Sequence, residues 1–249
     1  MPLQKLKFNP GVDRENTRYA AEGGWYETDK VRFRRGMPQK IGGWVRLSAG
    51  TFLGVCRSML NWVTLQQQNL VSVGTNLKYY IERGGAYFDI TPIRATATLT
   101  NPFTTTLNST TVLVTDNAHG ALQNDFVTFS GASAVGGLTL NGEFQINFVS
   151  DNSYNITAAS QASSGATGGG TVTAAYQVNT GNEIAVPFTG WSAGAWGAGT
   201  WGVGGTTLAP IRLWSQANFG EDLFFGYRGG SLFYWDASTG VNTRAVYVT

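Results

Sequence analysis

The chain has 249 residues, a length that fits one large all-β domain or two smaller ones and is enough to bury a hydrophobic core. It contains 33 glycines, and only 13% of its residues are charged. One cysteine excludes an intramolecular disulfide framework, and one histidine excludes a metal site built from paired imidazoles. The net charge of +2 conceals an asymmetry: residues 1–94 carry about +7, residues 95–205 about −5 and residues 206–249 about 0.

Short runs of valine, isoleucine, phenylalanine and tyrosine alternate with turn residues along the chain. This pattern predicts an all-β fold, because no window shows sustained helical spacing of apolar residues. Cys56 is expected to be a small buried strand residue, and His119 a turn residue. We expect no catalytic pair, no metal and no cofactor. No secretory signal is visible, and Pro187 and Pro210 argue against a membrane helix in the uncharged stretch that contains them.

Residues 1–50 are predicted to form an extended arm followed by a basic hairpin. Charged and apolar residues alternate over residues 30–34, so a strand there would place Lys30, Arg32 and Arg34 on one face. Arg35 begins a predicted turn over residues 35–38, and a returning strand is expected at residues 40–47. The cationic face is compatible with contacts to phosphates or to an acidic protein, and equally with a solvated outer face.

Two segments, residues 69–80 and 222–235, share one plan. Each has a polar entry, an apolar strand, a glycine-containing turn and then leucine with an aromatic strand. Repeated β-hairpins of this size are typical of β-propeller blades. Residues 51–94 and 206–249 are therefore predicted to be propeller-like hairpins. Two blades cannot close a propeller of about four to eight, so either the natural product is longer or the strands pack in another way.

The middle of the chain, residues 95–180, is predicted to be an inserted β-domain. Residues 98–205 contain no lysine or arginine. Four short strands are expected at residues 110–115, 125–129, 142–149 and 153–157, with a fifth at 170–176. Strands at this spacing, separated by turn residues, predict a small β-barrel or sandwich.

A glycine-rich segment, residues 181–205, follows the insert and carries Trp191, Trp196 and Trp201. A spacing of five fits neither a strand nor a helix, so we expect a looped connector whose indoles insert separately into a neighbouring surface. A membrane-interface belt or a sugar-stacking platform is the alternative. No Gly-Lys-Ser/Thr sequence follows these glycines, so nucleotide binding is not supported.

Five motifs resemble the structural tail proteins of short-tailed bacteriophages. They are KFNPGV (7–12), EGGWY (22–26), DKVRFR (29–34), PQKIGGW (38–44) and LWSQANFGEDL (213–223). The matching family members are tail tube or nozzle components similar to the packaged-DNA stabilisation proteins, and the resemblance covers residues 1–94 and 181–249. It implies a β-propeller with inserted β-domains. It also implies a hexameric ring of this chain, located in the virion tail below the portal and adaptor, which retains and conducts DNA.

A DNA conduit should not bind its cargo tightly or read its sequence, because each neutralised phosphate adds affinity. We therefore expect the basic N-terminal residues to contact neighbouring subunits, the adaptor or other tail proteins. The suspected contact residues are Lys30, Arg32, Arg34, Arg35, Trp191, Trp196 and Trp201.

Two other classes of function stay open. A carbohydrate-binding module of a tail would use the tryptophans of residues 191–201 or the aromatic residues of the second hairpin as stacking platforms. A glycan-cleaving enzyme would need paired carboxylates in a cleft. Glu221, Asp222 and Asp236 are close in sequence, but Glu221 and Asp222 would point to opposite faces of a strand, so we expect no enzyme.

Overall fold

The computed structural model describes residues 8–183 and 211–248, apart from residues 16, 21, 44, 46 and 47. Its regular elements are β-strands and one 3-10 helix, η1 (Ala237–Thr239), which confirms the prediction of an all-β chain. The chain divides into two compact units, Met1–Leu47 and Ser48–Thr249. The division into five segments that the sequence suggested stays a prediction.

The first unit contains one hairpin, formed by β1 (Val31–Arg34) and β2 (Met37–Lys40). Val31 and Phe33 are half-buried, whereas Arg32 and Arg34 are exposed, so the alternation expected for this strand is confirmed. The ring of Phe33 contacts Trp25, and Trp25 contacts Phe8. This small aromatic cluster lies behind the cationic face.

The returning strand of this hairpin was predicted at residues 40–47, and this was wrong: it begins at Met37. Arg35 and Gly36 have φ angles of 52° and 77°. Two successive positive φ angles are those of a type I′ turn, which returns the chain after only two residues. Pro38 lies opposite Phe33, one pair beyond the turn. Cross-strand hydrogen bonds skip that pair, so the missing N–H of proline removes no bond.

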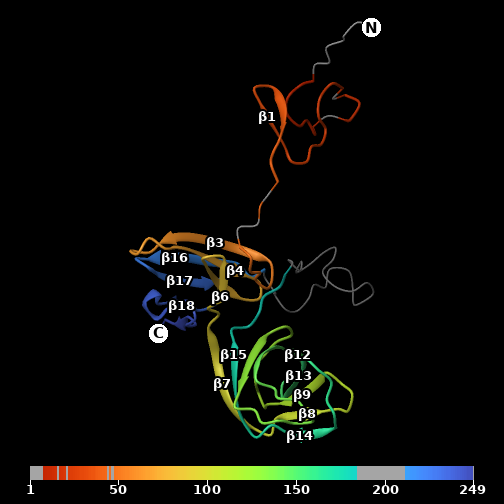
Figure 1. Cartoon of the computed structure of the whole chain (residues 1–249), viewed down its shortest axis with the longest axis vertical. Helices are drawn as coiled ribbons and strands as arrows, with labels where there is room; N and C mark the ends of the chain where they lie inside the picture. The colour runs from red at the N-terminus through yellow and green to blue at the C-terminus, as the bar shows by residue number, and fades with distance from the viewer. Residues whose placement is uncertain are drawn as a thin grey trace, which may run out of the picture. The chain divides into compact units, whose positions relative to one another are not determined.

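The second unit contains two four-stranded antiparallel sheets of the same order, each formed by consecutive strands. We call the first of them the first sheet; it comprises β3 (Cys56–Val63), β4 (Asn69–Thr75), β5 (Tyr79–Arg83) and β6 (Ala86–Asp89). The second sheet comprises β16 (Trp214–Phe219), β17 (Asp222–Tyr227), β18 (Leu232–Trp235) and β19 (Val246–Tyr247). One face of each sheet packs on the other around a shared core, with β3 beside β16 (Figure 1). We call this arrangement the stacked pair.

Aromatic rings fill the core of the stacked pair. The ring of Tyr79 stacks on Phe225, with centroids 3.8 Å apart, and Trp214 meets Tyr79 edge-on at 4.9 Å. Gly74 is required at this point, because a Cβ atom there would lie 2.6 Å from the indole of Trp214. The indole nitrogen of Trp214 donates to the carbonyl of Thr75 at 2.7 Å. The second repeat is thus anchored directly on the first.

The strands between the two sheets form a sandwich, which we call the insert. It is entered through β7 (Ile93–Thr100) and left through β15 (Thr171–Gln177), and these two strands pair with each other. One sheet has the order β11-β10-β15-β7 and the other β12-β13-β9-β8-β14, and a separate hydrophobic core lies between them. The remaining strands are β8 (Phe103–Thr105), β9 (Thr111–Thr115), β10 (Phe126–Ser130), β11 (Gly142–Gln145), β12 (Asn147–Ser150), β13 (Ser153–Thr157) and β14 (Ala166–Gly168).

The single strand predicted at residues 142–149 was wrong, because the chain there forms β11 and β12 in different sheets. Ile146 lies at the crossing, fully buried, and its N–H donates to the carbonyl of Asp125 at 2.7 Å. The alternating pattern of this segment conceals such a crossing, since Phe144 and Ile146 face the same core on either side of it.

Of the two single-residue expectations, that for Cys56 was wrong and that for His119 is confirmed. Cys56 is half-buried at the start of β3 rather than buried. His119 lies in the connection between β9 and β10, as expected for a turn residue, but it is only 6% exposed. Its ring packs on Tyr154, with centroids 4.9 Å apart.

Candidate functional site

The structure places four of the suspected contact residues on the β1–β2 hairpin. Arg32 and Arg34 lie on the exposed face of β1, and Lys30 and Arg35 flank the strand and are also exposed. In the described part of the first unit, the ion pair found is that of Arg14 with Glu27, so no acid there neutralises the hairpin. The three tryptophans at positions 191, 196 and 201 lie outside the described residues. The role of all seven residues stays a prediction.

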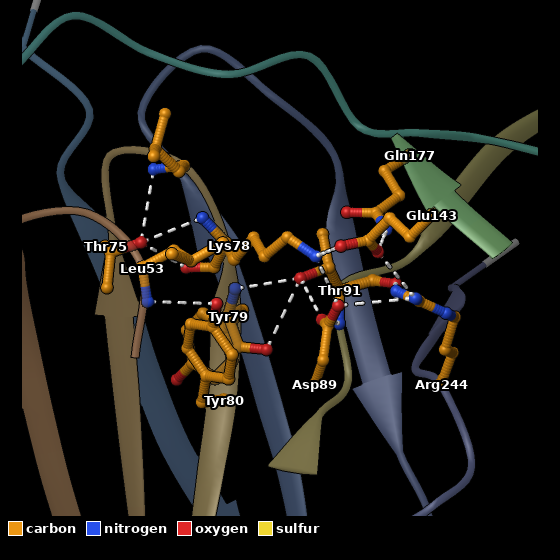
Figure 2. A network of polar contacts seen from close by, with 11 residues as sticks. Leu53, Thr75, Lys78, Tyr79, Tyr80, Asp89, Thr91, Glu143, Gln177 and Arg244 are labelled. Atoms are coloured by element: carbon orange, nitrogen blue, oxygen red, sulfur yellow. Dashed lines mark hydrogen bonds and ion pairs between the residues drawn. The ribbon is translucent and has the colours of Figure 1, made fainter. Parts of the chain in front are cut away.

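The most extensive charged cluster lies where the first sheet, the second sheet and the insert meet (Figure 2). Its centre is Lys78, whose side chain is 3% exposed. The ammonium group of Lys78 contacts Asp89 Oδ2 at 2.7 Å and also pairs with Glu143 Oε1. A buried lysine is stable only when carboxylates or other acceptors surround it, and here two carboxylates do so.

Arg244 closes the cluster from the opposite side. Its guanidinium lies 3.3 Å from Asp89 Oδ2 and 3.4 Å from Glu143 Oε2, and it donates to the carbonyl of Thr91 at 2.8 Å. Two cations and two carboxylates therefore alternate, with a formal charge of zero. We call these four residues, Lys78, Asp89, Glu143 and Arg244, the junction network.

Local structure fixes each member of the junction network. Thr75 Oγ1 accepts from the backbone N–H of Lys78 at 2.8 Å, which holds the tight turn between β4 and β5. Asp89 Oδ1 accepts from the N–H of Thr91 at 2.9 Å and from its hydroxyl at 2.5 Å. The side-chain amide of Gln177 donates to Glu143. Figure 2 shows these side chains converging from the first sheet, from the insert and from the segment before β19.

The electrostatics of the junction network favour a structural role. Burial by itself would raise the pKa of Asp89, but Lys78 and then Arg244 outweigh this effect, so the pKa lies below its ordinary value. Asp89 is thus ionised at neutral pH and held by two cations. A general acid or base needs a pKa near the working pH and an open approach for its substrate. Asp89 has neither property.

A second buried polar network lies inside the insert. The hydroxyl of Tyr176 donates to Asp116 at 2.5 Å, and it lies 2.7 Å from the hydroxyl of Tyr154. His119 Nδ1 accepts from the N–H of Ala121 at 3.0 Å, so His119 Nε2 carries the proton and donates to the carbonyl of Ser150 at 2.9 Å. Both nitrogens of the imidazole are thus used by the backbone.

The three carboxylates considered for an enzyme also make structural hydrogen bonds. Asp222 accepts from the hydroxyl of Tyr234 at 2.6 Å and from the N–H of Ala237 at 2.9 Å. Asp236 caps η1 through the N–H of Ser238 at 2.8 Å, and Glu221 accepts from the N–H of Leu65. Within the described ranges, no cluster of three metal-ligating side chains occurs, and no helix is long and apolar enough to cross a membrane.

Sequence reasoning missed the junction network, because 65 residues separate Lys78 from Glu143 and 101 separate Glu143 from Arg244. One signal was available. Glu143 is the only glutamate in residues 95–180, and that stretch has no lysine or arginine. An ion pair made by Glu143 therefore has to use a lysine or arginine from another part of the chain.

The comparisons with known proteins give little further information. No protein-family model matches this chain, and no curated protein matches it. Among solved structures, the chain is similar to a phage phi92 endosialidase, with 17% sequence identity and a TM-score of 0.32. The similarity covers 78% of this chain but only 28% of the endosialidase chain. At this TM-score the similarity carries no argument about the fold or the activity of this chain.

Proposed function

We propose that this chain is a non-enzymatic structural protein of a short-tailed bacteriophage tail, a tube or nozzle component that forms an oligomeric ring. The ring would sit below the portal and adaptor, retain the packaged genome and conduct it during ejection. The observation that carries the proposal is the set of five tail-protein motifs. The last of them, residues 213–223, forms β16 and its turn into β17, and it places Trp214 against Gly74 of the first repeat.

The charges of the second unit support a structural role. Lys78 and Arg244 are held by Asp89 and Glu143, and Arg94 and Arg212 donate to backbone carbonyls. These four cations are occupied by the protein itself and are poorly available to phosphates, whereas Arg83 and Arg228 are exposed. A conduit built in this way would exert little electrostatic drag on DNA.

The exposed hairpin of the first unit suits a contact with another protein. Arg32, Arg34, Lys30 and Arg35 present a cationic surface without acidic partners among the described residues of that unit. We assign this surface to a neighbouring subunit or to the adaptor, together with the tryptophans at positions 191, 196 and 201. DNA would pass through the channel without sequence-specific contacts.

The location of the protein in virions tests the proposal. Tails purified from disrupted particles should contain the protein in a fixed ratio to the portal, measured by quantitative mass spectrometry, and gold-labelled antibodies against the insert should decorate the tail. Particles assembled without the protein should package DNA and then lose it. Absence of the protein from purified tails would refute the assignment.

A charge substitution tests the hairpin contact. The variant Arg32→Ser/Arg34→Ser should join tails less efficiently in a reconstitution assay, and the wild-type protein should show the same loss as salt is raised. Arg228→Ser is a control, because Arg228 is exposed in the turn after β17, outside the hairpin. Equal incorporation of both variants would show that the hairpin is solvated and makes no contact.

A further inference from the structure

The second sheet has a second face that no described residue covers. We call it the open face; it is formed by Ala217, Phe219, Phe224, Tyr234 and Val246. Ala217 lies opposite Phe224, Phe224 opposite Tyr234 and Tyr234 opposite Val246, so these residues form one row across all four strands. Phe219 is 74% exposed and Val246 is 58% exposed. A continuous apolar row on a sheet surface is typical of an interface.

The hydrogen bonds of β4 show which side of the first sheet is buried in the stacked pair. The N–H of Thr75 donates to the carbonyl of Lys78, so Thr75 and every second residue before it bond toward β5. The residues between them, including Leu70 and Ser72, bond toward β3. Leu70 and Ser72 are buried, and Ser72 contacts Gln216 of the second sheet. The residues that β4 turns toward the second sheet thus bond back to the preceding strand. Val73 and Thr75, which are also buried, bond toward β5 and face the other side of the first sheet.

The opposite holds for the second sheet. Its first two strands are joined by the two-residue turn Gly220-Glu221, in which Gly220 has a φ angle of 65°, as in a type II′ turn. Asp222 and Phe224 therefore bond toward β16, and Leu223 and Phe225 bond toward β18. Leu223 and Phe225 are the residues buried against the first sheet. The buried side chains of β17 thus belong to residues that bond forward to the next strand.

The two sheets consequently contribute opposite sides to their contact. In L-amino-acid strands the direction of the backbone bonds fixes the direction of the side chain, so two sheets of the same order and different bonding present different faces. The stacking is head to tail. The open face of the second sheet is the same side that the first sheet buries, with the same aromatic and aliphatic character.

A matching surface exists on the other side of the first sheet. Met59 is 66% exposed and Val63 is 55% exposed, and both point away from the core along β3. At β5 and β6 the same side is covered, because Phe52 packs on Tyr80 and Tyr87. We call the exposed strip of Met59 and Val63 the front strip. Met59 and Val63 flank the exposed, uncharged Asn61. The open face carries one carboxylate, that of Asp222 opposite Phe219, which accepts from the hydroxyl of Tyr234 at 2.6 Å.

We propose that the open face of one copy docks on the front strip of a second copy, which continues the head-to-tail sheet stacking between molecules. Inside the chain the corresponding sides of the two sheets pack on each other, with other residues in the contact. A head-to-tail contact gives a ring when the rotation closes and a filament when it does not. Closure into a ring rests on the proposed function, whereas the contact itself does not.

Mixing two variants tests this contact. Light scattering after size-exclusion chromatography should show assembly of the wild-type protein that increases with concentration. Phe219→Asp should abolish assembly by disrupting the open face, and Met59→Asp by disrupting the front strip. A mixture of both variants should form a one-to-one dimer and nothing larger, because one intact open face and one intact front strip remain. Leu107→Asp, at an exposed position of the insert, should assemble like the wild type.

Each outcome of this experiment is decisive. Circular dichroism first establishes that both variants are folded, which their exposed positions favour. A wild-type protein that stays monomeric, or a mixture that stays monomeric, overturns the contact. Assembly of either variant alone does so as well, since it would require a different interface. A ring that survives both substitutions would refute the contact and leave the tail function standing, whereas absence from tails would refute the function whatever the variants do.

Discussion

The hydrophobic cores of the stacked pair and of the insert are built from different types of residue. The stacked pair is filled by large aromatic groups, among them Trp62, Trp214 and Phe225. The insert is filled mostly by valine, alanine and isoleucine, and its larger residues include Phe103 and Tyr154. Large rings suit two sheets that meet in a single broad contact. Small β-branched residues suit two sheets that interdigitate along several short strands.

The two regions also treat charge differently. In the insert, buried carboxylates accept hydrogen bonds from uncharged donors. Asp116 accepts from Tyr176, and Asp125 accepts from the N–H of Thr180 at 2.6 Å. The stacked pair contributes Lys78 and Arg244, and both reach Glu143 of the insert. The insert can thus satisfy these two carboxylates with uncharged donors and still be joined to a neighbour by one acid.

The largest effect is expected from an aromatic residue of the stacked pair. Phe225→Ala should lower the free energy of unfolding by about 3–5 kcal/mol, because it removes a fully buried ring that stacks on Tyr79. Urea denaturation followed by tryptophan fluorescence measures the change. Leu65→Ala, at a residue 86% exposed, should change it by less than about 0.5 kcal/mol. Equal values for the two variants would mean that the sheets do not pack as described.

The second-largest loss of stability is expected from removing the central cation of the junction network. Lys78→Met keeps the length of the side chain but leaves Asp89 and Glu143 with Arg244 alone. We expect a loss of about 3 kcal/mol, at the lower end for a broken buried pair, because both carboxylates are partly exposed. Arg83→Met, at an exposed position of β5, is the control. A stability equal to that of the wild type would show that the network contributes no net stabilisation.

The sequence predicted the strand class, the two repeats and most strands of the insert, because these depend on local patterns such as the alternation at residues 31–34. It did not predict β8 or β14, which have three residues each and leave no periodic signal. The crossing at Ile146 was also missed, since it depends on which sheet each half joins. The junction network was not predicted for the same reason, because its members meet only after the sheets have stacked.

An intermediate effect is expected inside the insert. Tyr176→Phe removes the hydroxyl that donates to Asp116, a residue 8% exposed, and should cost about 1–3 kcal/mol. Urea denaturation again measures the loss. Arg94 of β7 lies over the ring of Tyr176, but its guanidinium already donates to the carbonyl of His119. Tyr19→Phe, at a residue 93% exposed, serves as the control and should be neutral. If Tyr176→Phe were neutral as well, Asp116 would have to be satisfied in another way.

The smallest effect is expected from acid, acting on Asp89. The pKa of Asp89 is lower in the folded chain than its ordinary value of 3.8, so its stabilising contribution is complete above that value and disappears as the pH falls through the folded pKa. Asp89→Asn should therefore be less stable than the wild type at pH 7, and the difference should shrink below about pH 4. Urea denaturation at pH 7, 5, 4 and 3 measures both proteins, with Asp151→Asn, at an exposed position, as the control. The amide can still bond to Thr91 and Lys78, so the loss should be smaller than for Lys78→Met. A difference that grows toward acid pH would contradict the ion pairing of Asp89 with Lys78 and Arg244.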